Sequence, residues 1–135
     1  MPLYFFKVRN AIYAQMVNGD FYLLRKGQFV HILDRKSYGN DNVVGIFPHQ
    51  GSKLLLLTEH SGAFIFANGK ISRWKTSVDT ELMKYQVNRC VLLGQSKIVI
   101  GTISNGIYTI DINGKLLWHY NVENKLNDNT ILSLF

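Results

Sequence analysis

Cysteine, acidic side chains and long apolar runs are scarce in this chain of 135 residues, and each scarcity excludes a class of protein. The single cysteine, Cys90, excludes an internal disulfide framework and a thiolate zinc cluster. The apolar runs, such as the leucines at residues 54–57, are far below the roughly 18 residues of a membrane helix, so we expect no membrane contact by this segment. The first residues lack a basic stretch followed by a long apolar one, so they do not resemble a signal peptide.

The chain does have enough apolar material for one core. Hydrophobic residues make up 47% and charged residues 18%, a balance that argues against intrinsic disorder. Lysine and arginine outnumber aspartate and glutamate by 15 to 9, which gives a net charge of +6. The basic residues are scattered, and several fall at expected turns, where charge discourages wrong pairing of sheet edges. We therefore predict no nucleic-acid partner for this segment.

An internal repeat is the main feature of the sequence. The glycines of one recurrent turn are Gly19, Gly62 and Gly106, spaced by 43 and 44 residues, and those of a second turn are Gly27, Gly69 and Gly114, spaced by 42 and 45. Apolar stretches at residues 43–47, 87–91 and 131–135 recur with a spacing of 44. In this alignment Gln15 stands where the later units have Thr58 and Thr102.

Each unit contains four short runs with the composition of β-strands. In the third unit these are residues 87–93, 97–102, 106–111 and 115–120, and turn residues such as Asn113-Gly114 separate them, a pair that favours a type I′ hairpin. The second run is apolar without alternation at residues 54–57 and 98–100, which indicates a strand covered on both faces. Four-stranded units of this length, stacked face to face, are blades of a β-propeller. A β-sandwich, the competing fold, predicts alternation and no such period.

We therefore predict an all-β fold: a partial β-propeller of about three four-stranded antiparallel blades with a period near 44 residues. Residues 1–135 form a single propeller fragment, with blades at approximately residues 1–34, 43–76 and 87–122 and the opening strand of a further blade at residues 130–135. Residues 80–85, between two blades, are expected to make one helical turn. Because a closed propeller has four to eight blades, we expect the terminal faces to contact further blades of a parent protein or to self-associate.

The third unit carries a family resemblance. Residues 101–111, GTISNGIYTID, resemble the propeller repeat of bacterial hybrid two-component regulators, which runs Gly-Thr, a short turn, Gly, an aliphatic, an aromatic and then Asp. The second unit keeps Thr58, Gly62 and Phe64 of this pattern. Residues 123–134, ENKLNDNTILSL, look like the link between blades in that family.

The resemblance implies a function. In such proteins the propeller is the extracytoplasmic, periplasmic sensory part of a membrane-anchored regulator, and a histidine kinase or DNA-binding output lies elsewhere in the chain. This segment would then help to sense a small ligand, an oligosaccharide in several members, and to relay the signal without catalysis. The alternative comes from residues 111–118, DINGKLLW, which are similar to the repeat of pyrroloquinoline-quinone-type propellers. Relatives of that type without a cofactor are scaffolds for protein assembly.

Candidate site residues are few. The loop residues Glu59, His60, Ser104 and Asn105 are the predicted ligand-binding side chains, because loops on a rigid scaffold concentrate binding residues. The four histidines are spread along the chain and the carboxylates are dispersed, so we expect no metal site, no cofactor and no catalytic residues. An enzyme, either a quinone-dependent dehydrogenase or a glycan-cleaving propeller, is the least favoured alternative because no acid–base pair stands out.

Overall fold

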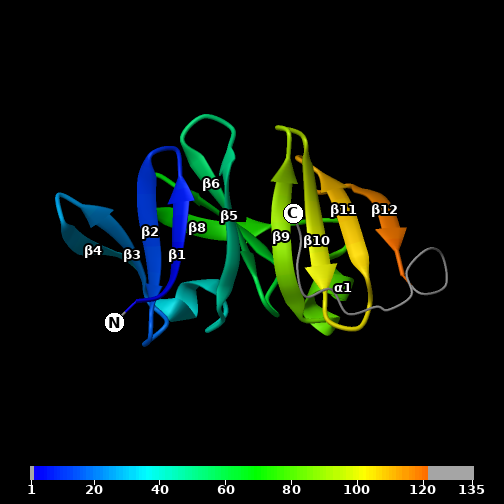
Figure 1. Cartoon of the computed structure of the whole chain (residues 1–135), viewed down its shortest axis with the longest axis horizontal. Helices are drawn as coiled ribbons and strands as arrows, with labels where there is room; N and C mark the ends of the chain where they lie inside the picture. Colours follow the sequence, from blue (N-terminus) through cyan, green and yellow to red (C-terminus); the bar gives the residue numbers. More distant parts are fainter. Residues whose placement is uncertain (1, 122–135) are drawn as a thin grey trace.

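The computed structural model describes residues 2–121, which form twelve strands in three separate sheets (Figure 1). Sheet 1 consists of β1 (Pro2–Val8), β2 (Ala11–Met16), β3 (Phe21–Arg25) and β4 (Gln28–Leu33). Sheet 2 consists of β5 (Val43–His49), β6 (Lys53–Thr58), β7 (Ala63–Ala67) and β8 (Lys70–Trp74). Sheet 3 consists of β9 (Val87–Leu93), β10 (Lys97–Thr102), β11 (Ile107–Asp111) and β12 (Leu116–Tyr120). The all-β class and the four antiparallel strands per unit are confirmed. The opening strand predicted at residues 130–135 lies outside the described residues.

Each sheet is a simple meander in which every strand pairs with the next one along the chain. The β7–β8 turn has the expected hairpin geometry, because Asn68 and Gly69 both have positive φ, at 54° and 76°. The turn at Asn113-Gly114 differs from the type I′ hairpin that we predicted. Gly114 has positive φ there and Asn113 does not, while the Asp111 carboxylate accepts the N–H groups of Asn113 and Lys115 at 2.8 and 3.0 Å. This side-chain cap makes the turn wider than a two-residue one.

The three first strands lie next to one another. β5 contacts both β1 and β9, and Figure 1 shows these three in the middle with β4 and β12 at opposite ends. Two short helical segments link the sheets, a 3₁₀ turn at Arg35–Tyr38 and helix α1 at Asp79–Lys84. The helical turn predicted at residues 80–85 is thus confirmed. Among the described residues, no helix has the length and apolar character that crossing a membrane requires.

Sheet 2 is covered on both faces, which explains its unbroken apolar strand. Leu54 and Leu56 pack in a core shared with sheet 1, and Leu55 and Leu57 pack in a second core shared with sheet 3. All four side chains are at most 4% exposed. Burial of a leucine side chain stabilises a fold by roughly 1.5–3 kcal/mol. The leucines of β6 therefore stabilise both cores at once. The prediction from the sequence, a strand buried on both faces, is confirmed at this position.

The hydrogen bonds correct our alignment of the first unit. The N–H of Thr58 donates to the Gly62 carbonyl at 3.0 Å, and the N–H of Thr102 donates to the Gly106 carbonyl at 2.9 Å. In sheet 1 the matching bond runs from Met16 to the Asp20 carbonyl at 2.9 Å. Met16, and not Gln15, therefore occupies the threonine position, and the true offset between the first two units is 42 residues. The alignment of Gly19 with Gly62 is wrong by one residue, whereas that of Gly27 with Gly69 agrees with the structure.

Buried Gln15 ties sheet 1 to the start of sheet 2. Its amide oxygen accepts the N–H of Val43 at 2.9 Å, and its amide nitrogen donates to the carbonyls of Asp41 and Gly19 at 2.9 and 3.1 Å. One step later in the repeat, the N–H of Val87 donates to the Glu59 carbonyl at 2.9 Å. In both cases a residue near the end of the second strand of one sheet accepts a hydrogen bond from the first residue of the next sheet.

Candidate functional site

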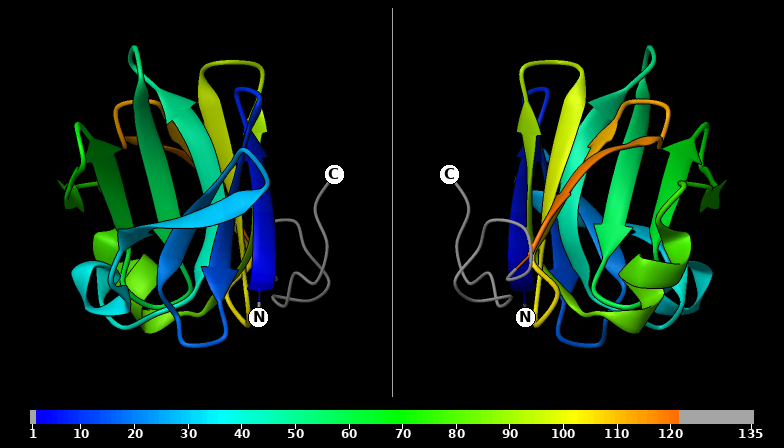
Figure 2. Two further views of the ribbon diagram at one scale, coloured as in Figure 1. Left: turned by 90° about the vertical axis from the view of Figure 1, so that its left-hand side faces the viewer. Right: turned by 90° about the vertical axis from the view of Figure 1, so that its right-hand side faces the viewer.

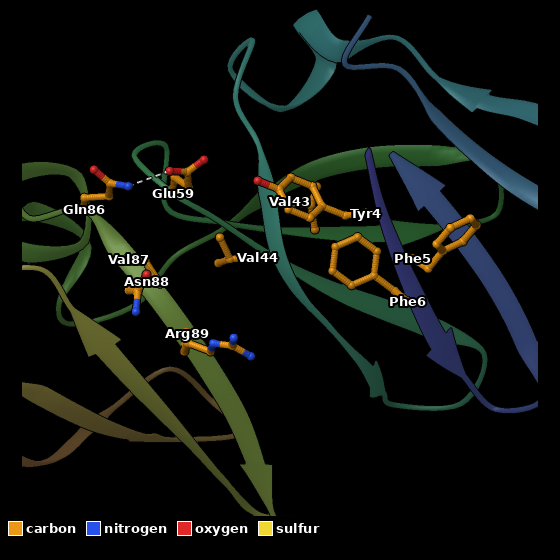
Figure 3. Close-up of a pocket in the computed structure, with 10 residues that line it drawn as sticks. All are labelled: Tyr4, Phe5, Phe6, Val43, Val44, Glu59, Gln86, Val87, Asn88 and Arg89. Atoms are coloured by element: carbon orange, nitrogen blue, oxygen red, sulfur yellow. Dashed lines mark hydrogen bonds between the residues drawn. The ribbon is translucent and has the colours of Figure 1, made fainter. Parts of the chain in front are cut away.

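A groove of about 480 Å³ lies along the first strands of all three sheets (Figure 3). Its aromatic residues are Tyr4, Phe5 and Phe6 of β1, and valines 43, 44 and 87 form its apolar lining on β5 and β9. Its polar residues, Glu59, Gln86, Asn88 and Arg89, come from the β6–β7 loop and from the start of β9. The volume falls within the range of about 300–1,000 Å³ for sites of small ligands, and the mixture of apolar and polar groups is typical of such sites.

Glu59 is fixed in place by four hydrogen bonds. Its carboxylate accepts the side-chain amides of Asn42 and Gln86 at 2.5 and 2.7 Å. Its backbone N–H donates to the Asn42 carbonyl at 3.0 Å, and its carbonyl accepts the N–H of Val87 at 2.9 Å. The carboxylate therefore faces the groove in a fixed orientation. It also connects the segment before sheet 2, through Asn42, to the segment after sheet 2, through Gln86.

Arg89 supplies a cation on the opposite side of the polar cluster. Its side chain is exposed and makes no hydrogen bond or ion pair with any residue in the part of the chain that the structure describes. Strand pairing makes it the counterpart of Gly45 in sheet 2 and of Tyr4 in sheet 1. Figure 3 shows the guanidinium extending from β9 toward the β1 side of the groove. An unpaired planar guanidinium is suited to a carboxylate or to hydroxyl oxygens of a ligand.

The structure separates the four predicted site residues. Glu59 lines the groove, whereas His60, Ser104 and Asn105 do not. Ser104 is exposed at the tip of the β10–β11 loop with φ of 75°. Asn105 donates its side-chain amide to the Tyr108 hydroxyl, and its carbonyl lies 2.9 Å from Nε2 of His119. These contacts order the loop, and a ligand-binding role for the four residues stays a prediction.

His60 is held beside a buried carboxylate. Asp41 accepts the backbone N–H of His60 at 2.6 Å and that of Asn42 at 2.7 Å, and its Oδ1 lies 3.5 Å from the His60 ring. Burial opposes ionisation of Asp41, but these hydrogen bonds outweigh it and lower its pKa. The Asn-Asp-Asn triplet at residues 40–42 is thus a turn whose aspartate caps backbone groups, as such side chains commonly do. The second such triplet, at residues 127–129, lies outside the described residues.

A second group of titratable side chains escaped the sequence analysis. Nε2 of His31 lies 3.3 Å from Asp20 Oδ2 and 3.1 Å from Asp34 Oδ1, and among the described residues this is the one group of three that could hold a metal ion. His31 and Asp34 are exposed, and the cations Arg35 and Lys36 line the same hollow as Asp20 and Asp34, so the carboxylates already have positive neighbours. The register of the β3–β4 hairpin, in which Tyr22 pairs with His31, was the signal that could have found it.

The remaining groove residues could also have been found from the repeat. Tyr4, Gly45 and Arg89 occupy matching positions on first strands, and in stacked sheets the first strands face a common space.

Compared with protein-family models, with curated proteins and with solved structures, the chain matches none. The family resemblance therefore depends on sequence motifs, the most specific of which lie in residues 101–134.

Proposed function

We propose that this chain is part of the extracytoplasmic sensory β-propeller of a membrane-anchored bacterial two-component regulator. Its three sheets would be propeller blades, and it would bind a small ligand, an oligosaccharide, and relay the signal without catalysing a reaction. Three four-stranded meanders with adjacent first strands support the propeller, because blades meet at their innermost strands. The regulator and its location are supported by the motif in residues 101–111.

The groove is the observation that carries the ligand-binding part of this proposal. Aromatic rings such as those of Tyr4 and Phe6 offer flat apolar surfaces to a sugar ring, while the Glu59 carboxylate and the Arg89 guanidinium offer an acceptor and a donor to its hydroxyl groups. Glu59 is also bonded to the links on both sides of sheet 2. A ligand that competes for this carboxylate would alter the contacts between sheets, which is a direct route for a signal.

Isothermal titration calorimetry with a panel of neutral and acidic oligosaccharides tests the proposal. We expect at least one to bind, and we expect Arg89→Gln and Glu59→Gln to weaken that binding at least tenfold. Arg25→Gln is the matched control, because Arg25 is also exposed but lies at the end of β3, outside the groove. Equal loss in Arg25→Gln and Arg89→Gln would contradict a site in the groove. A folded protein that binds no oligosaccharide would favour the alternative, a scaffold propeller for protein assembly.

A further inference from the structure

Sheets 1 and 3 each present one apolar face that no other sheet covers; Figure 2 views the molecule from these two ends. On sheet 1 this face contains Ile12 and Phe29, which are 38% and 39% exposed. On sheet 3 it contains Leu93 and Trp118, which are 47% and 46% exposed. Apolar side chains of this size gathered on one face usually mark a contact with another molecule.

The two internal interfaces show which kinds of face pack together. Each joins a face of a first type, which in sheet 2 carries Leu55 and Leu57, to a face of a second type, which in sheet 2 carries Leu54 and Leu56. At the interface between sheets 2 and 3, the second type is supplied by Ile98 and Ile100, the counterparts of Leu54 and Leu56 in the repeat. At the interface between sheets 1 and 2, the first type is supplied by Tyr13 and Gln15, the counterparts of Leu55 and Leu57.

The uncovered faces are one of each type. Ile12 is the counterpart of Leu54, so the open face of sheet 1 is of the second type. Val99 is the counterpart of Leu55 and pairs with Thr109, which in turn pairs with Trp118, so the open face of sheet 3 is of the first type. The two open faces are therefore of different types, as are the two faces that pack together at each internal interface.

A repeated ring contact supports this assignment. On third and fourth strands, Arg73 lies 4.8 Å from the Phe64 ring, and the rings of Tyr108 and His119 stack at 4.0 Å. Phe64 and Tyr108 are buried against the preceding sheet. Sheet 1 has the same pair in Tyr22 and His31, at 5.2 Å, but Tyr22 is only half-buried and His31 is exposed, since no sheet precedes it.

We propose that a second copy of this chain covers both open faces, so that sheet 3 of each copy packs against sheet 1 of the other. Two such contacts close a ring of six sheets with two-fold symmetry, and six is within the range of four to eight for closed propellers. The contact continues the internal interfaces and does not depend on the ligand proposed for the groove.

Sedimentation equilibrium of the full chain between 1 and 200 µM tests this. We expect a species of twice the 15.5 kDa chain mass. Ile12→Glu on sheet 1 and Trp118→Glu on sheet 3 should each raise the dissociation constant at least tenfold. An equimolar mixture of the two variants should contain more dimer than either variant alone, because one of the two contacts then joins an intact sheet 3 to an intact sheet 1.

Val17→Glu is the matched control, since Val17 is 62% exposed in the β2–β3 loop and lies on neither face. It should dimerise as the wild type does. Circular dichroism checks each fold, and Ile12→Gln or Trp118→Gln replaces a charged variant that fails to fold. A wild type that stays monomeric, a mixture that stays monomeric, a mass that keeps growing with concentration, or loss of dimer in Val17→Glu would each overturn the proposal.

Discussion

Gly45 and Cys90 form a size-matched pair across the contact between β5 and β9, and their coupling can be measured. A Cβ atom added at Gly45 would lie 2.2 Å from the Cys90 Sγ and 3.1 Å from the Phe47 ring. Ordinary contact begins at 3.4 Å, so the sulfur would have to move by about 1.2 Å. A cysteine has one side-chain torsion, so the sulfur cannot make this movement without leaving its rotamer well.

The expected magnitudes follow from this geometry. Gly45→Ala should destabilise the protein by about 1–3 kcal/mol, the usual cost of overpacking, reduced by the backbone entropy that alanine saves in a strand. Cys90→Ala should cost about 1 kcal/mol through lost packing. In the Cys90→Ala background the sulfur is gone, so adding Gly45→Ala should change stability by less than about 0.5 kcal/mol.

Urea denaturation followed by tryptophan fluorescence supplies the four free energies of unfolding for this double-mutant cycle. We expect a favourable coupling of about 1–3 kcal/mol between the two substitutions. Gly27→Ala is the control for a glycine without neighbours, because no atom lies within 4 Å of its added Cβ. It should show no coupling to Cys90→Ala, although its positive φ makes the single substitution costly. Additive effects of Gly45→Ala and Cys90→Ala would refute the packing that we describe.

Three further predictions use simpler assays. Burial raises the pKa of the Cys90 thiol to about 12, so a thiol reagent at pH 8 should label it in urea and leave the native protein unlabelled. Burial and the charge of Lys53 lower the pKa of His49 below 6.5, so protonation favours the unfolded state; the free energy of unfolding should fall as the pH drops below 6.5, and less steeply in His49→Gln. Gln15→Leu leaves the N–H of Val43 unpaired and should cost more than about 2 kcal/mol in urea denaturation, while an equally stable variant would contradict this role.

The strands of the fold could be predicted from the sequence because their signals are local. The unbroken leucines at residues 54–57 and the recurrent turn glycines indicate four strands in each unit, and the structure agrees. The one-residue error in the first unit arose because Gly19 resembles Gly62 in its neighbours, while the hydrogen bond of Met16 places the loop differently. Of the two glycine series, only the second, with 42 residues between Gly27 and Gly69, gives the offset that the hydrogen bonds show.

The candidate site was less accessible to sequence reasoning. Glu59 was selected from its loop, and it lines the groove, but Tyr4 and Arg89 lie 85 residues apart and come together only through the stacking of sheets. The cluster of His31 with Asp20 and Asp34 needed the strand register as well. Neither grouping forms a local motif: the groove requires a comparison of first strands across the sheets, and the cluster requires the pairing of strands within sheet 1.

The hydrogen bonds that join each sheet to the first strand of the next one also favour one order of assembly on the ribosome. The N–H of Val43 donates to the side chain of Gln15 in sheet 1, and the N–H of Val87 donates to the carbonyl of Glu59, which follows β6 of sheet 2. Each finished sheet is therefore the docking template for the strand that emerges next, and growth proceeds from the amino terminus one sheet at a time. Until the next sheet docks, the finished one presents an uncovered apolar face, and in a nascent chain such a face is a surface for aggregation.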